Sequence, residues 1–354
     1  MSVPPAAREY FLPKPGSYDK LTLQTKKLGK VRPTEVLVKV HAVSLQYRDL
    51  IVASGDYPVR VPDNLVPCSD MAGEIVDVGE DVKAWKVGDR VCANFATDHV
   101  YGDPTPDTQN TALGGQAQGV LTEYRAFPSH CLVSIPSHLS YEEASTLPCA
   151  GLTAYNALHG PKPVKAGDYV LTIGTGGVSI FGLQFAVAAG AVVIATSSSD
   201  AKLSTASKLG AKHLINYNKT ADWDQEVMKI TGGRGVDHVI EVGGPGTLPK
   251  SMTSARIGGS LHLIGFVARG TTDAGTLMGN SIRKALMLRA ILVGSKAQFV
   301  DMTRLLSANP DTRPMVDKVF AFEEAKDAYA YLSSQPHVGK VVIKVSKGVP
   351  GTYA

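Results

Sequence analysis

The sequence predicts an α/β protein in which a strand-rich part is joined to a parallel sheet with crossover helices. The chain has 354 residues, and at roughly 100–200 residues per domain this length favours two domains. From about Gly167 onward, short apolar runs alternate with amphipathic stretches, which is the pattern of a parallel β-sheet. The first 150 residues consist instead of short strand-like segments separated by turns.

Composition and charge exclude several classes of protein. Hydrophobic residues make up 44% of the chain and charged residues 19%, which suits a folded globular protein rather than a disordered one. There are 36 Lys and Arg against 32 Asp and Glu, and the resulting net charge of +4 is not concentrated in a basic arm. We therefore expect no nucleic acid among the main partners.

We expect a cytoplasmic protein with neither a membrane span nor a secretory signal. The longest near-apolar run, residues 185–195, is shorter than the roughly 18 residues that indicate a membrane span. The first ten residues lack the charged and apolar regions of a secretory signal. The four cysteines lie far apart without a C-x-x-C motif, which indicates reduced thiols rather than a disulfide scaffold.

The strand-rich first part alternates apolar and polar residues, as half-buried strands do. We predict strands at residues 36–40 and 74–79, and a turn at 86–91 that leads into a third strand. Residues 98–119 are rich in Asp, Pro, Thr, Gln and Gly, with few side chains to bury, so we expect a long surface loop. A helix at 141–144 is predicted to be capped by Ser140.

The second part alternates strands and helices. We predict strands at residues 169–173, 191–196, 213–216, 236–242 and 260–266. Helices are predicted at residues 178–189, as an amphipathic stretch, and at 201–209 and 223–231. A helix at 322–332 and a strand at 340–345 follow near the end of the chain.

The strongest chemical signal lies between the first of these parallel strands and its helix, in the segment Gly174-Thr175-Gly176-Gly177-Val178-Ser179. The first glycine permits a tight turn, and the second lets the backbone approach a pyrophosphate. The helix N-terminus then offers free N–H groups and the positive end of its dipole. Val242 and Gly243 end a later strand, at the edge where cofactors lie in such sheets. The segment predicts dinucleotide binding, against the alternative of a turn that only connects two elements.

The end of the next strand indicates which dinucleotide binds. NAD sites usually carry an Asp or Glu there, which binds the ribose 2′-hydroxyl. This sequence has Ser197 and Ser198, followed by Lys202, and such groups can bind a 2′-phosphate that a carboxylate would repel. Because a charge-assisted hydrogen bond contributes roughly 1.5–3 kcal/mol, we predict NADPH rather than NADH, with Asp200 facing solvent. The alternative is a solvated polar loop.

Several motifs together resemble a known family. They are residues 72–76, 86–91 and 149–155, the glycine loop, and Gly339-Lys340-Val341-Val342. These motifs are similar to those of the medium-chain dehydrogenase/reductase superfamily, and within it to the zinc-free branch of quinone oxidoreductases and enoyl reductases. The resemblance implies a GroES-like, β-rich catalytic domain formed by residues 1–150 and 294–354. It also implies a Rossmann domain, a doubly wound parallel sheet, at residues 151–293.

The same resemblance argues against zinc. Zinc-dependent relatives carry a Cys, a Gly-His-Glu and a later Cys, and this sequence has Gln46, Cys68-Ser69-Asp70 and Cys149 at those places. One thiolate and a possible Asp70 do not supply the three protein ligands of a catalytic zinc. Residues 98–119, where the relatives' structural-zinc lobe lies, contain no cysteine. We expect no metal site, and a Cys149 that is a buried, small apolar residue.

The resemblance also assigns residues to the cofactor. Thr153 is similar to a threonine that faces the nicotinamide, with a helix-interior Thr bonded to its own backbone as the alternative. Tyr217 is similar to a residue that covers the 2′-phosphate side, with a plain surface tyrosine as the alternative. Ile264 and Gly265 follow the strand that, in the family, presents backbone groups to the carboxamide.

Three residues are candidates for the substrate side. Gln46 could hydrogen-bond a substrate oxygen, and Tyr47 or Tyr57 could supply a proton. Core packing explains either tyrosine equally well, and water is an alternative proton donor. Arg48 and Asp49 are more simply explained as a structural ion pair or a helix cap.

These expectations lead to a predicted activity. Without zinc to polarise a simple carbonyl, direct hydride transfer to an activated C=C bond is favoured, because the developing enolate needs only modest hydrogen bonding. We predict a zinc-independent, NADPH-dependent oxidoreductase that acts on a small electrophilic enone, enal or quinone. The alternatives are a zinc-free alcohol or aldehyde dehydrogenase, in which Tyr47 or Arg48 replaces zinc, and an NADPH-binding protein without turnover. The resemblance implies a homodimer, and residues 285–293 could form an edge strand that pairs across a two-fold axis.

Overall fold

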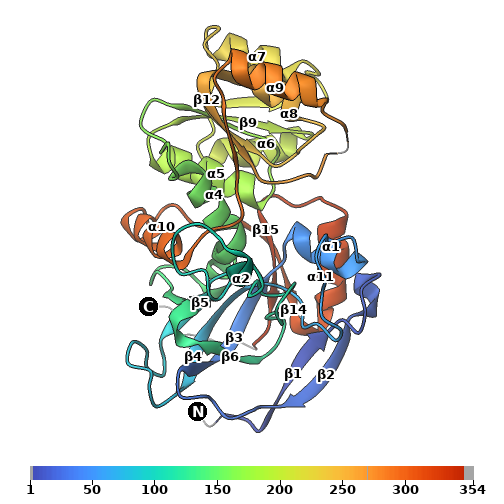
Figure 1. The fold of residues 1–354 in the computed structure, drawn as a ribbon, viewed down its shortest axis with the longest axis vertical. Helices are drawn as coiled ribbons and strands as arrows, with labels where there is room; N and C mark the ends of the chain where they lie inside the picture. The colour runs from blue at the N-terminus through green and yellow to red at the C-terminus, as the bar shows by residue number, and fades with distance from the viewer. Residues whose placement is uncertain (1–2, 269, 347–354) are drawn as a thin grey trace. The chain divides into compact units, whose positions relative to one another are not determined.

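The computed structural model describes residues 3–268 and 270–346. The chain divides into two compact units, shown in Figure 1. The first unit comprises Met1–Cys149 and Gly294–Ala354, and the second unit comprises Ala150–Val293. Each unit has its own hydrophobic core. Within the described ranges, no helix combines the length and apolar character that crossing a bilayer requires.

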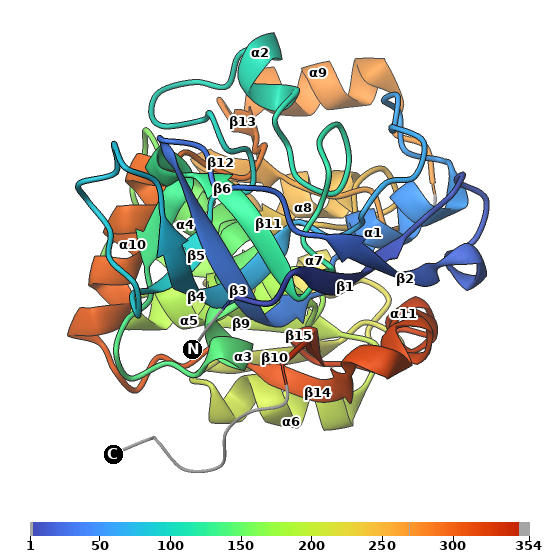
Figure 2. The ribbon, with the colours of Figure 1, turned by 90° about the horizontal axis from the view of Figure 1, so that it is seen from below.

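The first unit is built around a mainly antiparallel sheet of seven strands. The strand order is β14-β15-β3-β4-β5-β7, and β6 pairs with β3. Figure 2 shows β3, β4 and β5 side by side at the centre of this sheet. The strands are β3 (Glu35–Ser44), β4 (Asp70–Val78), β5 (Arg90–Ala93), β6 (Tyr124–Pro128), β7 (Leu132–Ser134), β14 (Val316–Ala321) and β15 (Lys340–Lys344).

The other elements of the first unit surround this sheet. They are an antiparallel pair of strands, β1 (Ala6–Phe11) and β2 (Thr22–Lys27), the α-helices α1 (Tyr47–Ser54), α2 (Pro106–Gln109), α3 (Tyr141–Ala144), α10 (Lys296–Ala308) and α11 (Ala325–Ser333), and the 3-10 turns η1 (Tyr18–Lys20), η2 (Ser129–Cys131) and η4 (Phe322–Glu324). A π-helical turn, η3 (Leu147–Gly151), follows α3 in the sequence.

The sequence pattern accounts for the central strands. Val36, Val38 and Val40 alternate along β3, and all three side chains are fully buried in the core of the first unit. The predicted strands at 36–40 and 74–79 are confirmed as parts of the longer β3 and β4. The predicted Ser140 cap is also confirmed, because Ser140 Oγ accepts a hydrogen bond from Glu143 N at 3.1 Å and Ser140 N donates to Glu143 Oε2 at 2.8 Å.

Residues 98–119 differ in part from the expected surface loop. The segment contains the short helix α2, and Ala112 and Leu113 are buried. A Cβ at Gly114 would come within 2.5 Å of the Cys68 backbone, so the segment packs against the turn before β4. The expectation of few side chains to bury is confirmed for most of the segment, because residues 100–107 are all exposed, whereas residues 112–115 pack into the core.

The second unit is a six-stranded sheet whose strand pairs are all parallel, in the order β10-β9-β8-β11-β12-β13. The chain moves outward from β8 to β10, then returns to β11 and moves outward to β13. This reversal makes the β8/β11 pair the switch point of a doubly wound Rossmann sheet. The strands are β8 (Tyr169–Thr172), β9 (Val192–Ser197), β10 (His213–Asn216), β11 (Val236–Glu241), β12 (Ala255–Leu263) and β13 (Met287–Ala290).

Helices connect these strands. They are α4 (Leu152–Leu158), α5 (Gly177–Ala188), α6 (Asp200–Lys208), α7 (Trp223–Ile230), α8 (Leu248–Ser254) and α9 (Ala274–Arg283). The predicted amphipathic character of residues 178–189 was wrong. Every residue of α5 from Ser179 to Ala186 is buried, so this helix is covered on all sides rather than on one. The strand predicted at 260–266 is β12, which begins at Ala255, five residues before the predicted start, and ends at Leu263.

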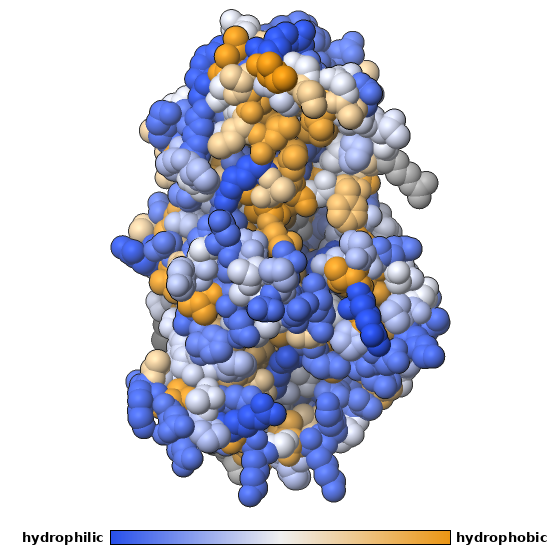
Figure 3. Space-filling view, viewed as in Figure 1, coloured by the Kyte–Doolittle hydropathy of each residue, from blue (hydrophilic) through white to orange (hydrophobic). Residues whose placement is uncertain are grey.

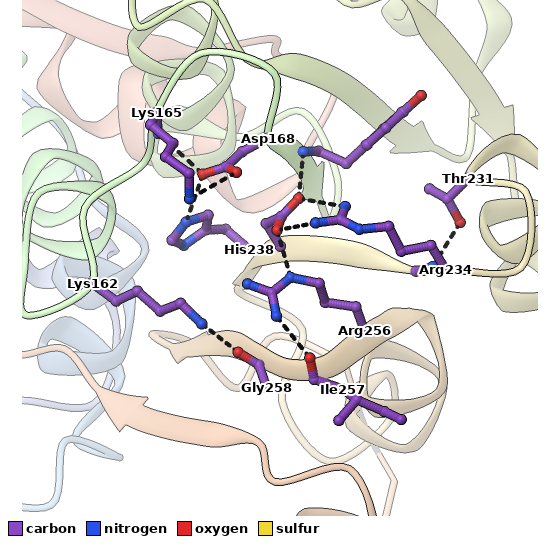
Figure 4. A network of polar contacts seen from close by, with 12 residues as sticks. Lys162, Lys165, Asp168, Thr231, Arg234, His238, Arg256, Ile257 and Gly258 are labelled. Atoms are coloured by element: carbon purple, nitrogen blue, oxygen red, sulfur yellow. Dashed lines mark hydrogen bonds and ion pairs between the residues drawn. The ribbon is translucent and has the colours of Figure 1, made fainter.

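A charged network lies at the amino-terminal edge of this sheet (Figure 4). Asp237, at the start of β11, accepts a bidentate pair of hydrogen bonds from Arg234 at 2.8 and 2.9 Å. Arg256 Nε and the Tyr169 backbone N–H also donate to this carboxylate. Burial by itself would raise the pKa of Asp237, but the hydrogen bonds from Arg234 and Arg256 outweigh burial and hold this pKa well below its usual range. The network joins β8, β11 and β12 at the edge opposite to their carboxyl ends.

Two buried histidines face each other between β11 and β12. His238 Nδ1 lies 3.1 Å from His262 Nε2, and the two rings are stacked. The Nδ1 atom of His262 is buried and has no hydrogen-bond partner among the described residues. Burial first, and then the neighbouring His238 and Arg289, together lower the pKa of His262 to about 3. Both rings are therefore neutral in the folded protein at neutral pH.

This pair predicts acid sensitivity of the second unit. Because the His262 pKa is lowered from 6.5 to about 3 on folding, only the unfolded state takes up the proton as pH falls below about 6.5. Stability is therefore lost between about pH 6.5 and pH 3. The substitution His262→Gln should reduce the loss of unfolding free energy between pH 7 and pH 5 by about 1–2 kcal/mol, measured by urea denaturation. His213→Gln, at a half-exposed histidine of β10, is the control, and an unchanged pH dependence in His262→Gln contradicts the assignment.

Candidate functional site

The glycine loop lies at the carboxyl edge of the parallel sheet, directly after β8. Gly174 has a φ of 77°, in the left-handed region that favours glycine. A Cβ at Gly174 or at Gly176 would meet no atom within 4 Å, so open space lies in front of the loop. Gly176 is the N-cap of α5, whose first N–H groups have no partner within the helix. Thr175, Gly177 and Val178 complete the turn into this helix end, which suits a pyrophosphate.

Ser179 explains how the loop tolerates the absence of a third glycine. Its side chain is buried, and its hydroxyl donates to the Ile173 carbonyl at 2.7 Å. The serine hydroxyl is therefore satisfied by the end of β8 while α5 stays close to the sheet.

The ends of β9 and β10 lie beside each other at the same edge. Ser197 is buried, with its Oγ 3.4 Å from Thr175 Oγ1, whereas Ser198 is exposed. Tyr217 N donates to Ser197 O at 3.0 Å, and the Tyr217 side chain is 39% exposed. Lys202 follows in the first turn of α6. Buried Ser197 therefore contacts the glycine loop through Thr175, while the exposed Ser198 and Tyr217 can reach a ligand.

Asp200, at the start of α6, is bonded to two neighbours. Its side chain is exposed, as predicted, and accepts a hydrogen bond from Asn216 Nδ2 at 2.7 Å and one from Lys219 Nζ. These two bonds lower the pKa of Asp200, so the carboxylate is ionised and its charge is balanced by Lys219.

Glu241 organises the turn after β11, at the predicted strand end Glu241-Val242-Gly243-Gly244. Its Oε1 accepts hydrogen bonds from Gly243 N at 2.8 Å, Gly244 N at 3.0 Å and Thr247 Oγ1 at 2.6 Å. A Cβ at Gly243 would lie 2.2 Å from Thr247 Oγ1, so this turn requires glycine. The bound carboxylate thereby holds Val242 and Gly243 at the carboxyl edge of the sheet.

The residues assigned to the nicotinamide lie in the same unit. Thr153 is buried in α4, and its hydroxyl makes no hydrogen bond to other described residues, which leaves it available to a ligand. The N–H groups of Ile264 and Gly265 donate to Glu241 O at 2.9 and 3.3 Å. Their carbonyl oxygens are therefore the backbone groups that could face a carboxamide. The open loop, the free helix end and these groups fit a nicotinamide dinucleotide.

A second set of polar residues lies in the first unit, around Gln46 at the start of α1. Gln46 is buried, and its Nε2 donates to Asp70 Oδ2 while its Oε1 accepts from Lys340 Nζ at 2.9 Å. Lys340 Nζ also donates to the Leu45 carbonyl. Asp49 anchors the same helix end, because its Oδ2 accepts from Gln46 N at 2.7 Å. Two strands, β4 and β15, and the start of α1 thus bring a carboxyl group, an ammonium and an amide together.

Asp70 is the acceptor at the centre of this cluster. Its Oδ1 accepts from Ser69 Oγ at 2.6 Å, and its Oδ2 accepts from the Cys149 backbone N–H at 3.0 Å as well as from Gln46. Burial raises the pKa of Asp70 to about 7, although the positive charge of Lys340 and the bond from Ser69 oppose the rise.

The donor set does not fit a catalytic zinc. Gln46 and Asp70 are bonded to each other, and an ammonium already occupies Gln46 Oε1. Within residues 3–268 and 270–346, no group of three or more His, Cys, Asp or Glu side chains could hold a metal ion. Cys68 has a φ of 68° and a buried thiol 3.3 Å from Tyr329 Oη. The prediction that Cys149 is buried was wrong, because its side chain is partly exposed in the turn η3.

The two tyrosines differ in their surroundings. Tyr47 is 40% exposed on α1, which excludes core packing as its role. Tyr57 is partly buried, and its hydroxyl oxygen accepts a hydrogen bond from Arg48 Nε at 3.1 Å, which leaves its own O–H as a donor. Arg48 is held further by the Leu113 carbonyl at 2.8 Å and by the ring of Phe95. Asp49 is the helix cap, whereas Arg48 bonds to other groups, so the alternative of a direct ion pair between them was wrong.

Sequence reasoning missed the role of Lys340. The residue was noticed only as part of a closing motif, although a lysine inside the apolar run of a final strand is itself an unusual signal. Gln46, Tyr47 and Tyr57 lie in the first unit, whereas all the cofactor candidates lie in the second.

Comparison with known proteins identifies the family. Residues 32–137 match the family model of the alcohol dehydrogenase GroES-like domain, and residues 177–308 match that of zinc-binding dehydrogenases. The chain is 50% identical to the zinc-type alcohol dehydrogenase-like protein C1773.06c of Schizosaccharomyces pombe, over 89% of this chain and 92% of the relative.

Two further relatives are named for reductive activities. The chain is 29% identical to a 2-haloacrylate reductase of Burkholderia sp, over 93% of this chain and 96% of the relative. It is 30% identical to a protein named "Probable quinone oxidoreductase" of Schizosaccharomyces pombe, over 93% of this chain and 94% of the relative. With both domains matched along most of its length, the chain belongs to the medium-chain dehydrogenase/reductase superfamily and is an oxidoreductase of this NAD(P)-binding family.

Proposed function

We propose that the chain is a zinc-independent, NADPH-dependent reductase of activated C=C bonds. The observation that carries this proposal is the Gln46, Asp70 and Lys340 cluster, which holds one hydrogen-bond donor, the Gln46 amide, at a position that resembles a zinc ligand of relatives. A hydrogen-bond donor suffices for an enolate oxygen, whereas reduction of an unconjugated carbonyl gains more from a Lewis acid. The reductases among the relatives support the same reaction class.

The proposed mechanism assigns a role to the residues of each unit. The glycine loop and the residues after β11 and β12 would hold a nicotinamide dinucleotide, which would supply a hydride for the β-carbon of the substrate. Gln46 Nε2 donates its second hydrogen to the substrate carbonyl oxygen as negative charge develops there. The α-carbon then takes a proton from the Tyr57 hydroxyl, which Arg48 positions, or from water.

The first prediction concerns the product formed from an unsaturated aldehyde. With NADPH and trans-2-hexenal, the product identified by gas chromatography and mass spectrometry should be hexanal, because the enolate pathway reduces the C=C bond. Gln46→Leu should lower kcat about 10- to 100-fold, since one oxyanion donor is removed. Formation of 2-hexen-1-ol would show carbonyl chemistry and replace the proposal by the zinc-free alcohol or aldehyde dehydrogenase. Tight NADPH binding without turnover of any electrophile would favour a binding protein.

Preference for NADPH rests on the edge formed by β9, β10 and α6. Ser198 and Tyr217 are exposed there, Lys202 lies one turn away, and Asp200 is turned to Lys219. No carboxylate at the end of β9 opposes a 2′-phosphate, because Ser197 and Ser198 take the place of the usual acid.

The second prediction tests this preference. Ser198→Asp places a negative charge at the end of β9, and the KM for NADPH should rise about 10-fold or more through repulsion of the 2′-phosphate. The KM for NADH should change less than about threefold. Ser204→Asp, at an exposed serine of α6, is the matched control. Equal effects on both cofactors would contradict the assignment of this edge.

Zinc independence gives a third prediction. The purified protein should contain less than about 0.1 zinc per chain by plasma mass spectrometry, because the proposed donors do not form a closed or open zinc site. Prolonged treatment with 1,10-phenanthroline should leave the rate unchanged. Stoichiometric zinc whose removal abolishes activity would overturn this part of the proposal.

We also propose a homodimer that forms through β13. This strand is the outer strand of the parallel sheet, and the outer edge of β13 has no strand partner among the described residues. Large apolar side chains are exposed in this part of the second unit, on β12 and α9: Ile257 at 71%, Met278 at 66% and Ile282 at 74%. Figure 3 shows apolar side chains gathered on the visible face of the second unit.

The fourth prediction is the mass of the protein in solution. Light scattering coupled to size exclusion should give about twice the chain mass of 37.4 kDa at micromolar concentration. A mass of one chain would contradict pairing through β13.

A further inference from the structure

Lys340 is a buried cation whose only hydrogen-bond acceptors, within the described residues, lie at the start of α1. Its side chain in β15 is 4% exposed, and Nζ donates to Leu45 O and to Gln46 Oε1. Burial lowers the pKa of Lys340, and the negative charge of Asp70 opposes this effect. Burying an ammonium is costly unless its hydrogen bonds are made. An apolar side chain would fill the same space at lower cost, so we looked for a role of Lys340 in its hydrogen bond to Gln46.

The chemistry of the two neighbours allows only one orientation of the Gln46 amide. An ammonium is a donor only, so the atom that faces Lys340 must be the amide oxygen. The Asp70 oxygen that faces Gln46 also accepts the Cys149 backbone N–H, so it acts as an acceptor and the atom that faces it is the amide nitrogen. Reversal of the amide would put Nε2 against the ammonium and Oε1 against the carboxylate, and would break both bonds.

This locked orientation leaves one hydrogen of Gln46 unused. The amide nitrogen carries two hydrogens, of which Asp70 takes one. The backbone of Gln46 is held as well, because its N–H donates to Asp49 Oδ2 at 2.7 Å. The side chain therefore presents one rigid N–H, at low cost in conformational entropy, to an acceptor outside the cluster.

We propose that Lys340 is a positioning residue that holds Gln46 as a hydrogen-bond donor for the carbonyl oxygen of the substrate. This inference rests on the proposed function and makes it narrower, because it requires a substrate whose C=C bond is conjugated to a carbonyl group. Without Lys340, Asp70 still binds the amide nitrogen, but no donor holds the amide oxygen. The amide can then rotate about its bond to Asp70 and turn its oxygen toward the carbonyl oxygen of the substrate, and two acceptors would face each other. A purely structural Lys340 would contribute to stability and would leave the response of a bound carbonyl unchanged.

The experiment uses 4-(dimethylamino)cinnamaldehyde, a conjugated aldehyde whose absorption band moves to longer wavelength when its oxygen accepts a hydrogen bond. Bound together with NADP⁺, which has no hydride to give, the probe reports on the carbonyl oxygen without turnover. The wild-type protein should shift the band to longer wavelength. Lys340→Met should lose at least about half of this shift, because the orientation of the donor is no longer held.

Lys344→Met is the matched control. Lys344 lies on the same strand, is half exposed, and pairs with Glu142 rather than with the cluster. It should keep both the band shift and the rate of the wild-type protein.

In Lys340→Met, kcat for enal reduction should fall about 10- to 100-fold, while the KM for NADPH stays within about twofold. In the Lys340→Met background, Gln46→Leu should cost little more, because the two residues act as one unit.

A second variant covers the case in which Lys340→Met does not fold. Lys340→Gln keeps an N–H donor for the Leu45 carbonyl, but its amide can act as donor or acceptor toward Gln46 and so no longer selects one orientation. Its band shift should also be reduced. A wild-type shift in either folded variant, additive losses in the double variant, or no shift in the wild-type protein would overturn the proposal.

The two proposals fail in different ways. If enals are reduced at the C=C bond but the band shift does not depend on Lys340, the positioning role is wrong and the proposed function stands. If the Lys340-dependent shift is present but the product is an allylic alcohol, the positioning role stands and C=C reduction is wrong.

Discussion

Parallel pairing of strands is the constraint on which the cofactor site of the second unit depends. In a parallel sheet all carboxyl ends meet at one edge, so the loops that follow β8, β9, β10, β11 and β12 gather there although they are far apart in sequence. The glycine loop, the serines after β9 and the turn held by Glu241 are useful only because of this edge. The opposite edge carries the Asp237 network, which joins three strands. These stabilising charges therefore lie away from the edge where the glycine loop is.

The first unit follows another constraint, which is that buried polar groups must be satisfied. Asp70, Gln46 and Lys340 are all buried, and Gln46 bonds to both of the others, while Ser69, Cys149 and Leu45 complete the hydrogen bonds of Asp70 and Lys340. A donor-only and an acceptor-only neighbour then give Gln46 one orientation. In this way a requirement of folding produces an oriented hydrogen-bond donor, which is the element that the proposed reaction needs.

Local patterns were sufficient for much of the fold. The alternation in β3, the cap at Ser140 and the run of strands and helices after Gly167 arise from short-range preferences, and the structure confirms them. Errors arose where distant contacts decide burial. Helix α5 is covered on all sides because both the sheet and its neighbours pack on it, and Gly114 and its neighbours, within an otherwise exposed segment, pack against the turn at Cys68.

The sequence by itself determined the family, the α/β class and the glycine loop, because these depend on residues that are neighbours in the chain. It also contained every residue of the Gln46 cluster, but not their association. Lys340 is 294 residues from Gln46 in the sequence, and no local pattern predicts that a lysine of the last strand donates to an amide at the first helix. Only the tertiary structure decided this contact, because burial and antiparallel pairing of β15 with β3 bring the two side chains together.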